Sequence, residues 1–480
     1  MSITQTNFSG DGAPSDLFVA LDRSEPRRLR AQIEGALREG IQAGRIRGGT
    51  ALPPSRLLAR ELGVSRSVIV EAYGQLVAEG YLEARRGART QVVQPAAPPA
   101  IAGDVAFAVW VSNQHLSGLP DPASFPRREW MRHYRSVMLE YPNASFHYPE
   151  TQGKVELRRA LAGYLGRVRA VQTRPEQIVV CGGFAQGLAL ICRALHRRGI
   201  LQLAVEDPCF FFHRRLVRAA GLEPVPVRVD EHGLDVAQLT QLPVEAVLLS
   251  PAHSYPTGAV LSPERRIELA TWARQRDAIV IEDDYDAEFR YDRNPIGALQ
   301  GLAPEHVIYG GSTSKTLTPA LRLGWLVVPA RLLEDVLLAK VMDDIATEAF
   351  GQLTLARFIE TGAFSRHLRH VRPIYRSRRD RLIAALGRHL PDWTPAGVAA
   401  GLHVFVWLPH DVSEAELVRE AHARKLNIEG AARHWADKRN APPAILIGYG
   451  AQHERVLDRT VASLSSLALT ATGADLTHNR

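Results

Sequence analysis

The sequence predicts two domains of different fold class: a small α+β domain first, then a large α/β domain. Up to residue 93, short amphipathic segments with helical spacing are followed by a strand, a glycine turn and a second strand. From residue 105, apolar strand-like runs alternate with helical stretches, as in α/β proteins. A run rich in alanine and proline, Gln94 to Gly103, separates the two patterns and is typical of a linker. The 480 residues leave room for both domains.

Composition limits the cellular context without deciding the function. The formal charge of +7, from 58 basic and 51 acidic side chains, suits an anionic partner but does not require one. Three cysteines without CxxC spacing favour a reducing compartment, so we expect the cytoplasm. No apolar run reaches the roughly 18 residues of a membrane span, so no membrane partner is expected. The expected segments are a flexible leader (1–20), the small domain (21–93), the linker (94–104) and the large domain (105–480).

Three helices and a hairpin are expected in the small domain. Apolar positions recur at helical spacing over 28–43 and over 56–62, and Gly63 ends the second of these helices. A third helix follows over 65–79, with its first serine as the cap. Residues 81–93 predict two strands around a glycine turn with three arginines. Two helices about a short turn, followed by such a wing, indicate a winged helix-turn-helix, which reads DNA.

The contacts with DNA follow from this geometry. The N-terminal residues of a recognition helix face the major groove, so Arg66 is the expected base contact. Arginines at the start of the preceding helix and in the wing are expected to hold the phosphate backbone or enter the minor groove. Each of them could instead be a solvated surface residue. The residues expected at the DNA are Arg56, Ser65, Arg66, Ser67, Arg86 and Gly87.

The small domain resembles the GntR family of bacterial regulators. The matching residues are Leu52-Pro53-Pro54-Ser55-Arg56, Val64-Ser65-Arg66 and Glu79-Gly80-Tyr81-Leu82. This resemblance implies that double-stranded promoter DNA is a partner.

The large domain is expected to contain a mostly parallel sheet covered by helices, because its strand-like runs alternate with helical stretches. Ligands of such sheets bind at the carboxyl ends of the strands, so the residues after each strand matter most. The expected strands are 177–181, 201–205, 246–250, 278–282, 307–309 and 323–328.

Three of these strands are followed by residues suited to a ligand. The first is followed by Gly182-Gly183-Phe184 and a helix, whose free amides suit a phosphate. The fourth is followed by Asp283-Asp284-Tyr285-Asp286, which could bind a metal, cap a helix or pair with a cationic ring nitrogen. We interpret Asp284 and Asp286 as turn and capping residues. The fifth is followed by Gly310-Gly311-Ser312-Thr313-Ser314-Lys315 and then Arg322, which suit an anion.

Together these segments supply a lysine amine, a carboxylate, a phenol and phosphate donors, the groups that a pyridoxal phosphate site needs. Their order and spacing resemble the fold type I aminotransferases over residues 105–465. The motifs His253-x-Tyr255-Pro256-Thr257-Gly258, Glu282-Asp283-Asp284-Tyr285-Asp286 and Pro295-x-x-Ala298-Leu299-Gln300 resemble the MocR/GabR regulators. That family joins a GntR-type domain to an aminotransferase-like domain, which has a smaller C-terminal α/β subdomain.

The resemblance implies a role for each residue of the site. Lys315 forms the internal aldimine with pyridoxal 5′-phosphate, Asp283 pairs with the pyridine nitrogen and Tyr285 contacts the ring oxygen. Phe210 covers one face of the ring, and Arg433 binds a carboxylate of the effector through a bidentate fork. The phosphate is held by Gly183, Phe184, Ser312 and Arg322, and by Tyr148 from the partner subunit of a homodimer.

Two departures from the aminotransferase pattern bear on activity. Tyr255 stands where many aminotransferases have an asparagine, so that contact with the ring oxygen is lost or passes to His253. Residues 444–449 contain no basic residue, although aminotransferases usually place a carboxylate-binding arginine there. Efficient transamination is therefore not expected, whereas exchange of Lys315 for an amine ligand is sufficient for sensing.

We therefore expect a pyridoxal-phosphate-dependent transcription regulator that senses an amino compound by aldimine exchange at Lys315. Two other functions stay open. One is a working aminotransferase with a DNA-binding appendage, and the other is a regulator that senses pyridoxal phosphate itself. No metal is expected to take part.

Overall fold

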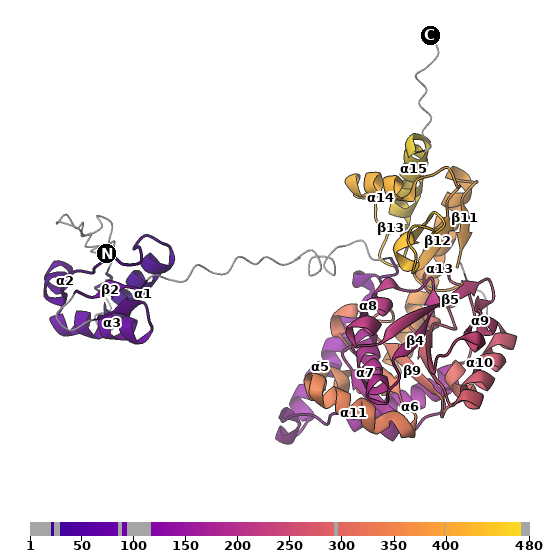
Figure 1. Ribbon diagram of the computed structural model, residues 1–480, viewed down its shortest axis with the longest axis horizontal. Helices are drawn as coiled ribbons and strands as arrows, with labels where there is room; N and C mark the ends of the chain where they lie inside the picture. The colour runs from indigo at the N-terminus through magenta and orange to yellow at the C-terminus, as the bar shows by residue number, and fades with distance from the viewer. Residues whose placement is uncertain are drawn as a thin grey trace, which may run out of the picture. The chain divides into compact units, whose positions relative to one another are not determined.

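The computed structural model describes residues 21–23, 29–84, 89–93, 117–291, 296–397 and 399–471. The chain divides into two compact units, Met1–Val109 and Trp110–Arg480 (Figure 1). The predicted leader (1–20), the linker (94–104), Arg86 and Gly87 lie outside the described residues. The domain boundaries that we expect from the sequence therefore stay predictions.

The first unit is a winged helix-turn-helix, as predicted. It contains α1 (Leu29–Gln42), α2 (Ser55–Leu62) and α3 (Arg66–Ala78), followed by β1 (Leu82–Glu83) and β2 (Gln91–Val92). The two strands pair antiparallel. The three helices and both strands contribute to one apolar core. This packing leaves Arg66 and Ser67 at the start of α3 exposed, as a recognition helix requires.

The ends of α2 and α3 agree with the sequence in part. Gly63 ends α2 with a φ of 59°, the left-handed conformation that glycine adopts at low cost. The prediction that Ser65 caps α3 is confirmed for its position but not for a capping hydrogen bond. Ser65 occupies the cap position, but its side chain makes no capping hydrogen bond, and its Oγ lies 2.8 Å from Oγ of Ser67. The two hydroxyls therefore satisfy each other on the exposed surface.

The second unit is built on an eight-stranded sheet with the order β3-β10-β9-β8-β7-β4-β5-β6. Strand β10 is antiparallel to β3 and β9, and β6 is antiparallel to β5. All other neighbours are parallel, which confirms the mostly parallel sheet. The strands are β3 (Ile178–Cys181), β4 (Gln202–Asp207), β5 (Glu223–Asp230), β6 (Gly233–Leu234), β7 (Ala246–Leu249), β8 (Ile279–Asp283), β9 (Val307–Ser312) and β10 (Gly324–Val327).

Strand β5 is absent from the sequence prediction because Pro224 and Pro226 interrupt its apolar pattern. Proline lacks the N–H that a central strand donates, so it is tolerated where one side of a strand is unpaired. Both prolines pair in register with β4, while pairing with β6 begins only at Val229. At both prolines, the edge of β5 that faces away from β4 is therefore not paired with β6.

Helices cover both faces of this sheet. Alternate residues of a strand point to opposite faces, and in β8 Ile279 and Ile281 belong to one apolar core while Val280 belongs to another. The first core includes α7 (Phe184–Arg197) and α11 (Ala330–Asp344). The opposite face is covered by α6 (Val155–Arg169), α10 (Pro263–Arg276) and α12 (Ala349–Glu360).

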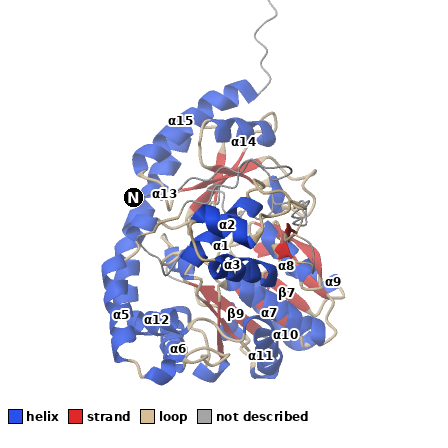
Figure 2. Cartoon of the chain, turned by 90° about the vertical axis from the view of Figure 1, so that its left-hand side faces the viewer, coloured by secondary structure: helices blue, strands red, loops and turns tan. Residues whose placement is uncertain are grey.

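A smaller subdomain completes the unit, as the resemblance implies. Its antiparallel sheet has the order β11-β12-β14-β13. Helices α13 and α15 pack along each other beside it (Figure 2). Within the described residues, no helix is long and apolar enough to cross a membrane. The elements are α13 (Ala363–His389), β11 (Thr394–Ala396), β12 (His403–Trp407), α14 (Glu414–Ala423), β13 (Ile428–Gly430), β14 (Ala444–Gly448) and α15 (Glu454–Ala471).

Candidate functional site

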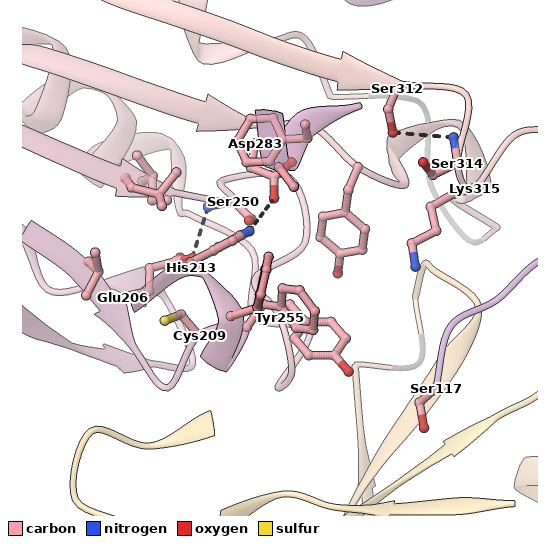
Figure 3. Close-up of a pocket in the computed structure, with 18 of the residues that line it drawn as sticks. Ser117, Glu206, Cys209, His213, Ser250, Tyr255, Asp283, Ser312, Ser314 and Lys315 are labelled. Atoms are coloured by element: carbon pink, nitrogen blue, oxygen red, sulfur yellow. Dashed lines mark hydrogen bonds and ion pairs between the residues drawn. The ribbon is translucent and has the colours of Figure 1, made fainter. Parts of the chain in front are cut away.

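A cavity of about 210 Å³ lies at the carboxyl ends of the parallel strands (Figure 3). Ligands of α/β sheets bind at this edge. Residues at or just after the ends of β4, β7, β8 and β9 line it together with residues from the start of α7 and from the segment before the sheet. The polar and aromatic lining residues are Ser117, Phe184, Glu206, Phe210, Phe212, His213, Ser250, Tyr255, Asp283, Tyr285, Ser312, Ser314, Lys315 and Arg322.

Lys315 brings the one amine in this lining. It follows β9, and its Nζ donates a hydrogen bond to the carbonyl oxygen of Gly118 at 2.9 Å. Burial lowers the pKa of Lys315, although the carboxylates of Asp286 and Asp283 act to raise it. A lowered pKa increases the share of neutral amine, which is the nucleophilic form.

Asp283 brings a buried carboxyl group whose Oδ1 has no hydrogen-bond partner. Its Oδ2 lies 3.7 Å from Nε2 of His213. Burial lowers the pKa of His213 to about 4, so this ring is neutral at pH 7 and does not pair with Asp283 as an ion. Burial also raises the pKa of Asp283 well above its usual value. An unpartnered buried oxygen is costly, so this position suits a ligand that brings a cationic N–H.

Tyr285 is positioned by a buried histidine and carboxylate. Its Oη lies 3.0 Å from Nδ1 of His253, which lies 2.8 Å from Oδ2 of Asp286. Burial raises the pKa of Tyr285, so its hydroxyl stays protonated near neutral pH. His253 itself is outside the lining of the cavity. The structure thus places His253 in contact with Tyr285, which differs from the contact with the ring oxygen that the sequence suggested.

Gly183 and Arg322 form a cradle at one end of the cavity. Gly183 precedes α7 with a φ of +98°, and a Cβ atom there would lie 3.2 Å from both terminal nitrogens of Arg322. Ser312 is the last residue of β9 and accepts a hydrogen bond from the backbone N–H of Ser314 at 3.3 Å. An arginine, a hydroxyl and the free amides of a helix start are the donors that bind phosphate.

Aromatic rings form the walls of the cavity. Phe210 packs edge-on against Tyr255 at 5.5 Å and against His213 at 5.4 Å between ring centroids. The ring of Phe184 lies 5.7 Å from that of His213 and occupies space that a side chain at Gly310 would fill. Such walls suit a flat, planar ligand.

The interpretation of Asp284 and Asp286 as turn and capping residues holds only in part, because Asp286 occupies the cap position of a short 3-10 helix (Ala287–Phe289) without making a capping hydrogen bond. Asp284 is buried, accepts a hydrogen bond from Nε of Arg169 at 2.7 Å and another from Oη of Tyr309 at 2.6 Å. Asp286 is buried against His253. The cluster follows a strand that is buried on both faces, so its carboxylates point into the protein and need charged or polar partners there.

Besides Gly183 and His253, the predicted residues Arg433 and Tyr148 do not line the cavity. Nε of Arg433 donates to Oε1 of Glu429 at 3.0 Å, and its guanidinium lies 4.6 Å from the ring centroid of Phe211. Tyr148 is 86% exposed on the surface of its own chain. Its predicted role belongs to a partner subunit and stays a prediction.

Sequence reasoning missed several residues of the site. His213 could have been found, because it lies one helical turn after Phe210 and therefore shares its face. Glu206 accepts the backbone N–H of Ser250 at 3.0 Å, and burial raises its pKa to about 7. No sequence signal marks Ser117, which comes to the cavity from a distant part of the chain.

The predicted DNA contacts within the described residues are all exposed. Arg56 lies in the first turn of α2, and Ser65, Arg66 and Ser67 lie at the start of α3. Exposure is a requirement for contact with DNA, and the contacts themselves stay predictions.

Comparison with known proteins identifies the family. Residues 29–92 match the gntR family of bacterial regulatory proteins, and residues 127–430 match aminotransferase class I and II. The chain is 32% identical over 456 residues to the HTH-type pyridoxine biosynthesis transcriptional regulator PdxR of Corynebacterium glutamicum, covering 94% of this chain and 98% of that one. It is 30% identical over 484 residues to the probable rhizopine catabolism regulatory protein MocR of Rhizobium meliloti, covering 95% and 97%. The chain belongs to the MocR-type regulators.

Solved structures agree with the fold of the large unit of this MocR-type regulator. The kynurenine aminotransferase of Pyrococcus horikoshii superposes with a TM-score of 0.69 at 24% identity, covering 78% of this chain and 95% of that one. The α-aminoadipate aminotransferase LysN of Thermus thermophilus gives 0.68 at 24% identity, covering 77% and 96%. The MocR-type chain thus joins a DNA-binding domain to an aminotransferase-like fold.

Proposed function

We propose that this chain is a pyridoxal-phosphate-dependent transcription regulator that binds promoter DNA and responds to an amino compound at Lys315. One observation carries the proposal. A single cavity brings together the Lys315 amine, an unpartnered oxygen of buried Asp283, and Arg322 beside the Gly183 cradle. These are the three groups that a cofactor with an aldehyde, a ring nitrogen and a phosphate requires.

The residues present fit this cofactor. When bound, pyridoxal phosphate supplies an aldehyde that reacts with amines and a ring that withdraws electrons. Asp283 Oδ1 is available for the ring N–H, and His213 borders the other oxygen of the same carboxyl group. Tyr285 has a protonated hydroxyl for the ring oxygen, and Phe210 provides an apolar surface for one ring face. The phosphate would be held by Arg322, Ser312 and the amides of Gly183 and Phe184.

An amino compound can act in this cavity by competing with the Lys315 amine for the aldehyde. Burial lowers the pKa of Lys315 and so favours the neutral amine, which is the form that reacts with an aldehyde. The response of DNA binding is limited to the difference between the effector's affinities for the two states of the protein. We further propose a cytoplasmic homodimer, since helix-turn-helix dimers bind two half-sites and Tyr148 would then reach the partner's cavity.

Spectroscopy combined with DNA binding tests this function. The full chain would be titrated with pyridoxal phosphate and then with amino acids, amino sulfonates and diamines, while anisotropy follows its affinity for a fragment selected from random DNA at fixed salt. We expect a yellow absorbance that Lys315→Ala abolishes, and an amine that changes both the absorbance and the affinity. If no amine alters DNA binding by the cofactor-loaded chain, the sensing proposal fails.

A specific observation favours a second candidate, a regulator that senses pyridoxal phosphate itself. Among the described residues that line the cavity, the cationic side chains are Lys315 and Arg322, and the cofactor would engage both. Arg433, the expected partner of an effector carboxylate, is already paired with Glu429. The similarity to a pyridoxine biosynthesis regulator points the same way. A change in DNA affinity on adding the cofactor alone would select this candidate.

A further inference from the structure

Residues Ser117, Gly118 and Leu119 form a short segment seated directly on the candidate site. Ser117 and Leu119 line the cavity, and the carbonyl oxygen of Gly118 accepts the hydrogen bond from Lys315 Nζ at 2.9 Å. Figure 3 shows Ser117 and Lys315 among the residues around the cavity. In sequence, this segment follows the predicted linker (94–104) and the DNA-binding unit. The amine at the centre of the proposed function therefore holds a segment of the chain that leads back to the DNA-binding unit.

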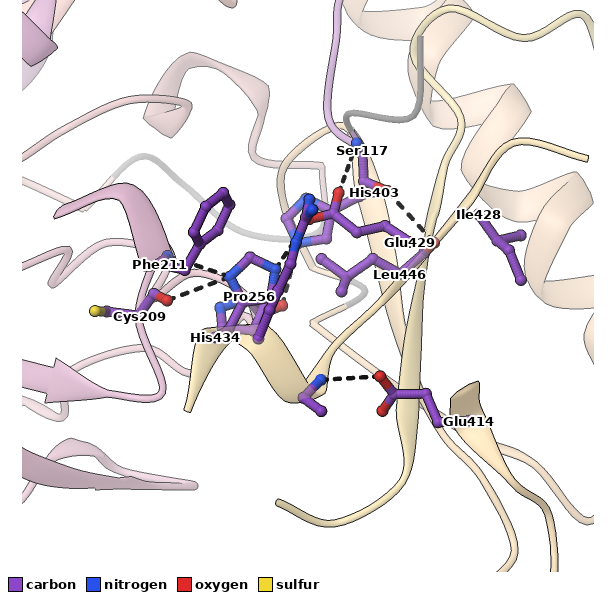
Figure 4. Close-up of polar contacts among 12 residues, drawn as sticks. Ser117, Cys209, Phe211, Pro256, His403, Glu414, Ile428, Glu429, His434 and Leu446 are labelled. Carbon is purple, nitrogen blue, oxygen red and sulfur yellow. Dashed lines mark hydrogen bonds and ion pairs between the residues drawn. The ribbon is translucent and has the colours of Figure 1, made fainter. Parts of the chain in front are cut away.

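A second contact holds the other end of this segment. The backbone N–H of Ser117 donates to Oε2 of buried Glu429 at 3.0 Å (Figure 4). The same carboxylate lies 3.0 Å from Nε2 of His434 and accepts from Nε of Arg433 at 3.0 Å. Although burial acts to raise it, the pKa of Glu429 is lowered to about 2 by His434 and Arg433. Glu429 therefore stays charged and keeps its hydrogen bond to Ser117. The hydrogen bond from Lys315 to Gly118 is the one that a ligand reacting with the amine can break.

Two glycines allow the segment to lie close to the small subdomain. A Cβ atom at Gly450 would collide with the carbonyl oxygen of Leu119, and one at Gly448 would lie 3.2 Å from the backbone nitrogen of Gly118. Gly118 itself has a φ of +79°, which other residues rarely adopt. The position of the segment therefore depends on a close backbone fit as well as on its hydrogen bonds.

The chain directly after the segment is anchored as well. The backbone N–H of Asp121 donates to Oη of Tyr375 at 3.0 Å, and Arg378 donates to its Oδ2 at 2.8 Å. Both partners belong to α13. Loss of the Lys315 contact therefore frees Gly118 between two points that stay anchored, Ser117 at Glu429 and Asp121 at α13.

We propose that residues 117–119 are a latch that reports the state of the Lys315 amine to the chain that leads to the DNA-binding unit. A free amine has up to three N–H donors and holds Gly118 in place. An aldehyde that condenses with the amine forms a C=N bond, releases one water and leaves the nitrogen with at most one N–H, so the latch is released. The hydrogen bond between Lys315 and Gly118 is made within this chain and does not depend on the proposed function. The identity of the ligand that breaks it rests on the proposed function.

Hydrogen exchange of the full chain without cofactor tests the latch directly. Lys315→Met keeps the side-chain length and removes the donor, whereas Lys438→Met changes an exposed lysine elsewhere and serves as the matched control. We expect the amides of residues 117–119 to exchange about tenfold faster in Lys315→Met and at the unchanged rate in Lys438→Met. Addition of pyridoxal phosphate to the unmodified chain should produce the same increase. Equal exchange in Lys315→Met and the unmodified chain would overturn the latch.

Gly450→Ala provides an independent test. The added Cβ displaces the backbone of Leu119, while every residue that lines the cavity keeps its side chain. We expect faster exchange at residues 117–119, an unchanged cofactor absorbance, and a DNA affinity already shifted toward that of the ligand-bound chain. A loosened segment with an unshifted DNA affinity would refute the latch as the route of the signal. Failure of the unmodified chain to develop cofactor absorbance would instead refute the proposed function, while exchange in the cofactor-free variants would still decide whether Lys315 holds the segment.

Discussion

Replacement of Asp283 by asparagine should weaken cofactor binding and, at the same time, stabilise the cofactor-free chain. In the cofactor-free protein this carboxyl is buried, has an unpartnered Oδ1 and lies near other carboxylates. Its raised pKa means that the folded state binds the proton more tightly than the unfolded state. The stability is therefore highest below the unfolded pKa, about 4, and falls as the pH rises through the folded pKa. Asp283→Asn removes this loss of stability at higher pH, because an amide side chain does not ionise.

The magnitudes follow from the environment of the side chain. Asparagine keeps a polar group at this position but carries no charge for burial to penalise, and we expect a gain of about 1–3 kcal/mol in the free energy of unfolding at pH 7. Loss of a charged hydrogen bond to the ring nitrogen costs about 1.5–3 kcal/mol, so the Kd for pyridoxal phosphate should rise about 10- to 150-fold. Urea unfolding of the cofactor-free chain and an absorbance titration measure the two effects.

Asp284→Asn is the matched control, one residue away. It breaks a buried ion pair with Arg169 and should lower the free energy of unfolding by about 3–5 kcal/mol, the opposite sign. If Asp283→Asn destabilises the chain as Asp284→Asn does, or leaves the cofactor affinity unchanged, the assignment of the free oxygen to the ring nitrogen is refuted.

Four further predictions follow from the site and the DNA-binding unit. Arg66→Ala should weaken binding to the selected DNA by about 1–3 kcal/mol and lessen the preference over random DNA, as measured by anisotropy; equal losses on both DNAs would indicate a phosphate contact instead. Gly183→Ala should weaken pyridoxal phosphate more than pyridoxal, because the added Cβ crowds Arg322; equal effects would exclude Gly183 from the phosphate cradle. Glu206→Gln should reduce the fall in thermal stability as the pH rises from 4.5 to about 7, because burial raises the pKa of Glu206 in the folded state; an unchanged pH profile would contradict this. Steady-state turnover of amino-acid and keto-acid pairs should be slow, because Tyr255 replaces the usual asparagine and β14 has no basic residue; rapid turnover would make the chain an aminotransferase.

Much of the fold and the chemistry of the site could be predicted because their signals are local. Helical and strand periodicity located the DNA-binding helices and six strands of the large sheet. Glycines and charged residues directly after those strands pointed to Lys315, Asp283 and Arg322, and the cavity contains all three. Strand β5 was not predicted, because its two prolines hide a strand that is stabilised by pairing with β4.

The sequence by itself determined which residue types are available at the edge of the sheet, since each follows its own strand along the chain. Only the tertiary structure decided which of them face the cavity. In the folded chain Asp283 lines the cavity, whereas Asp284 pairs with Arg169 and Asp286 pairs with His253. The tertiary structure also placed Gly118 on Lys315, 197 residues away. Partners so far apart in sequence leave no local pattern, because packing of the whole domain is what brings them together.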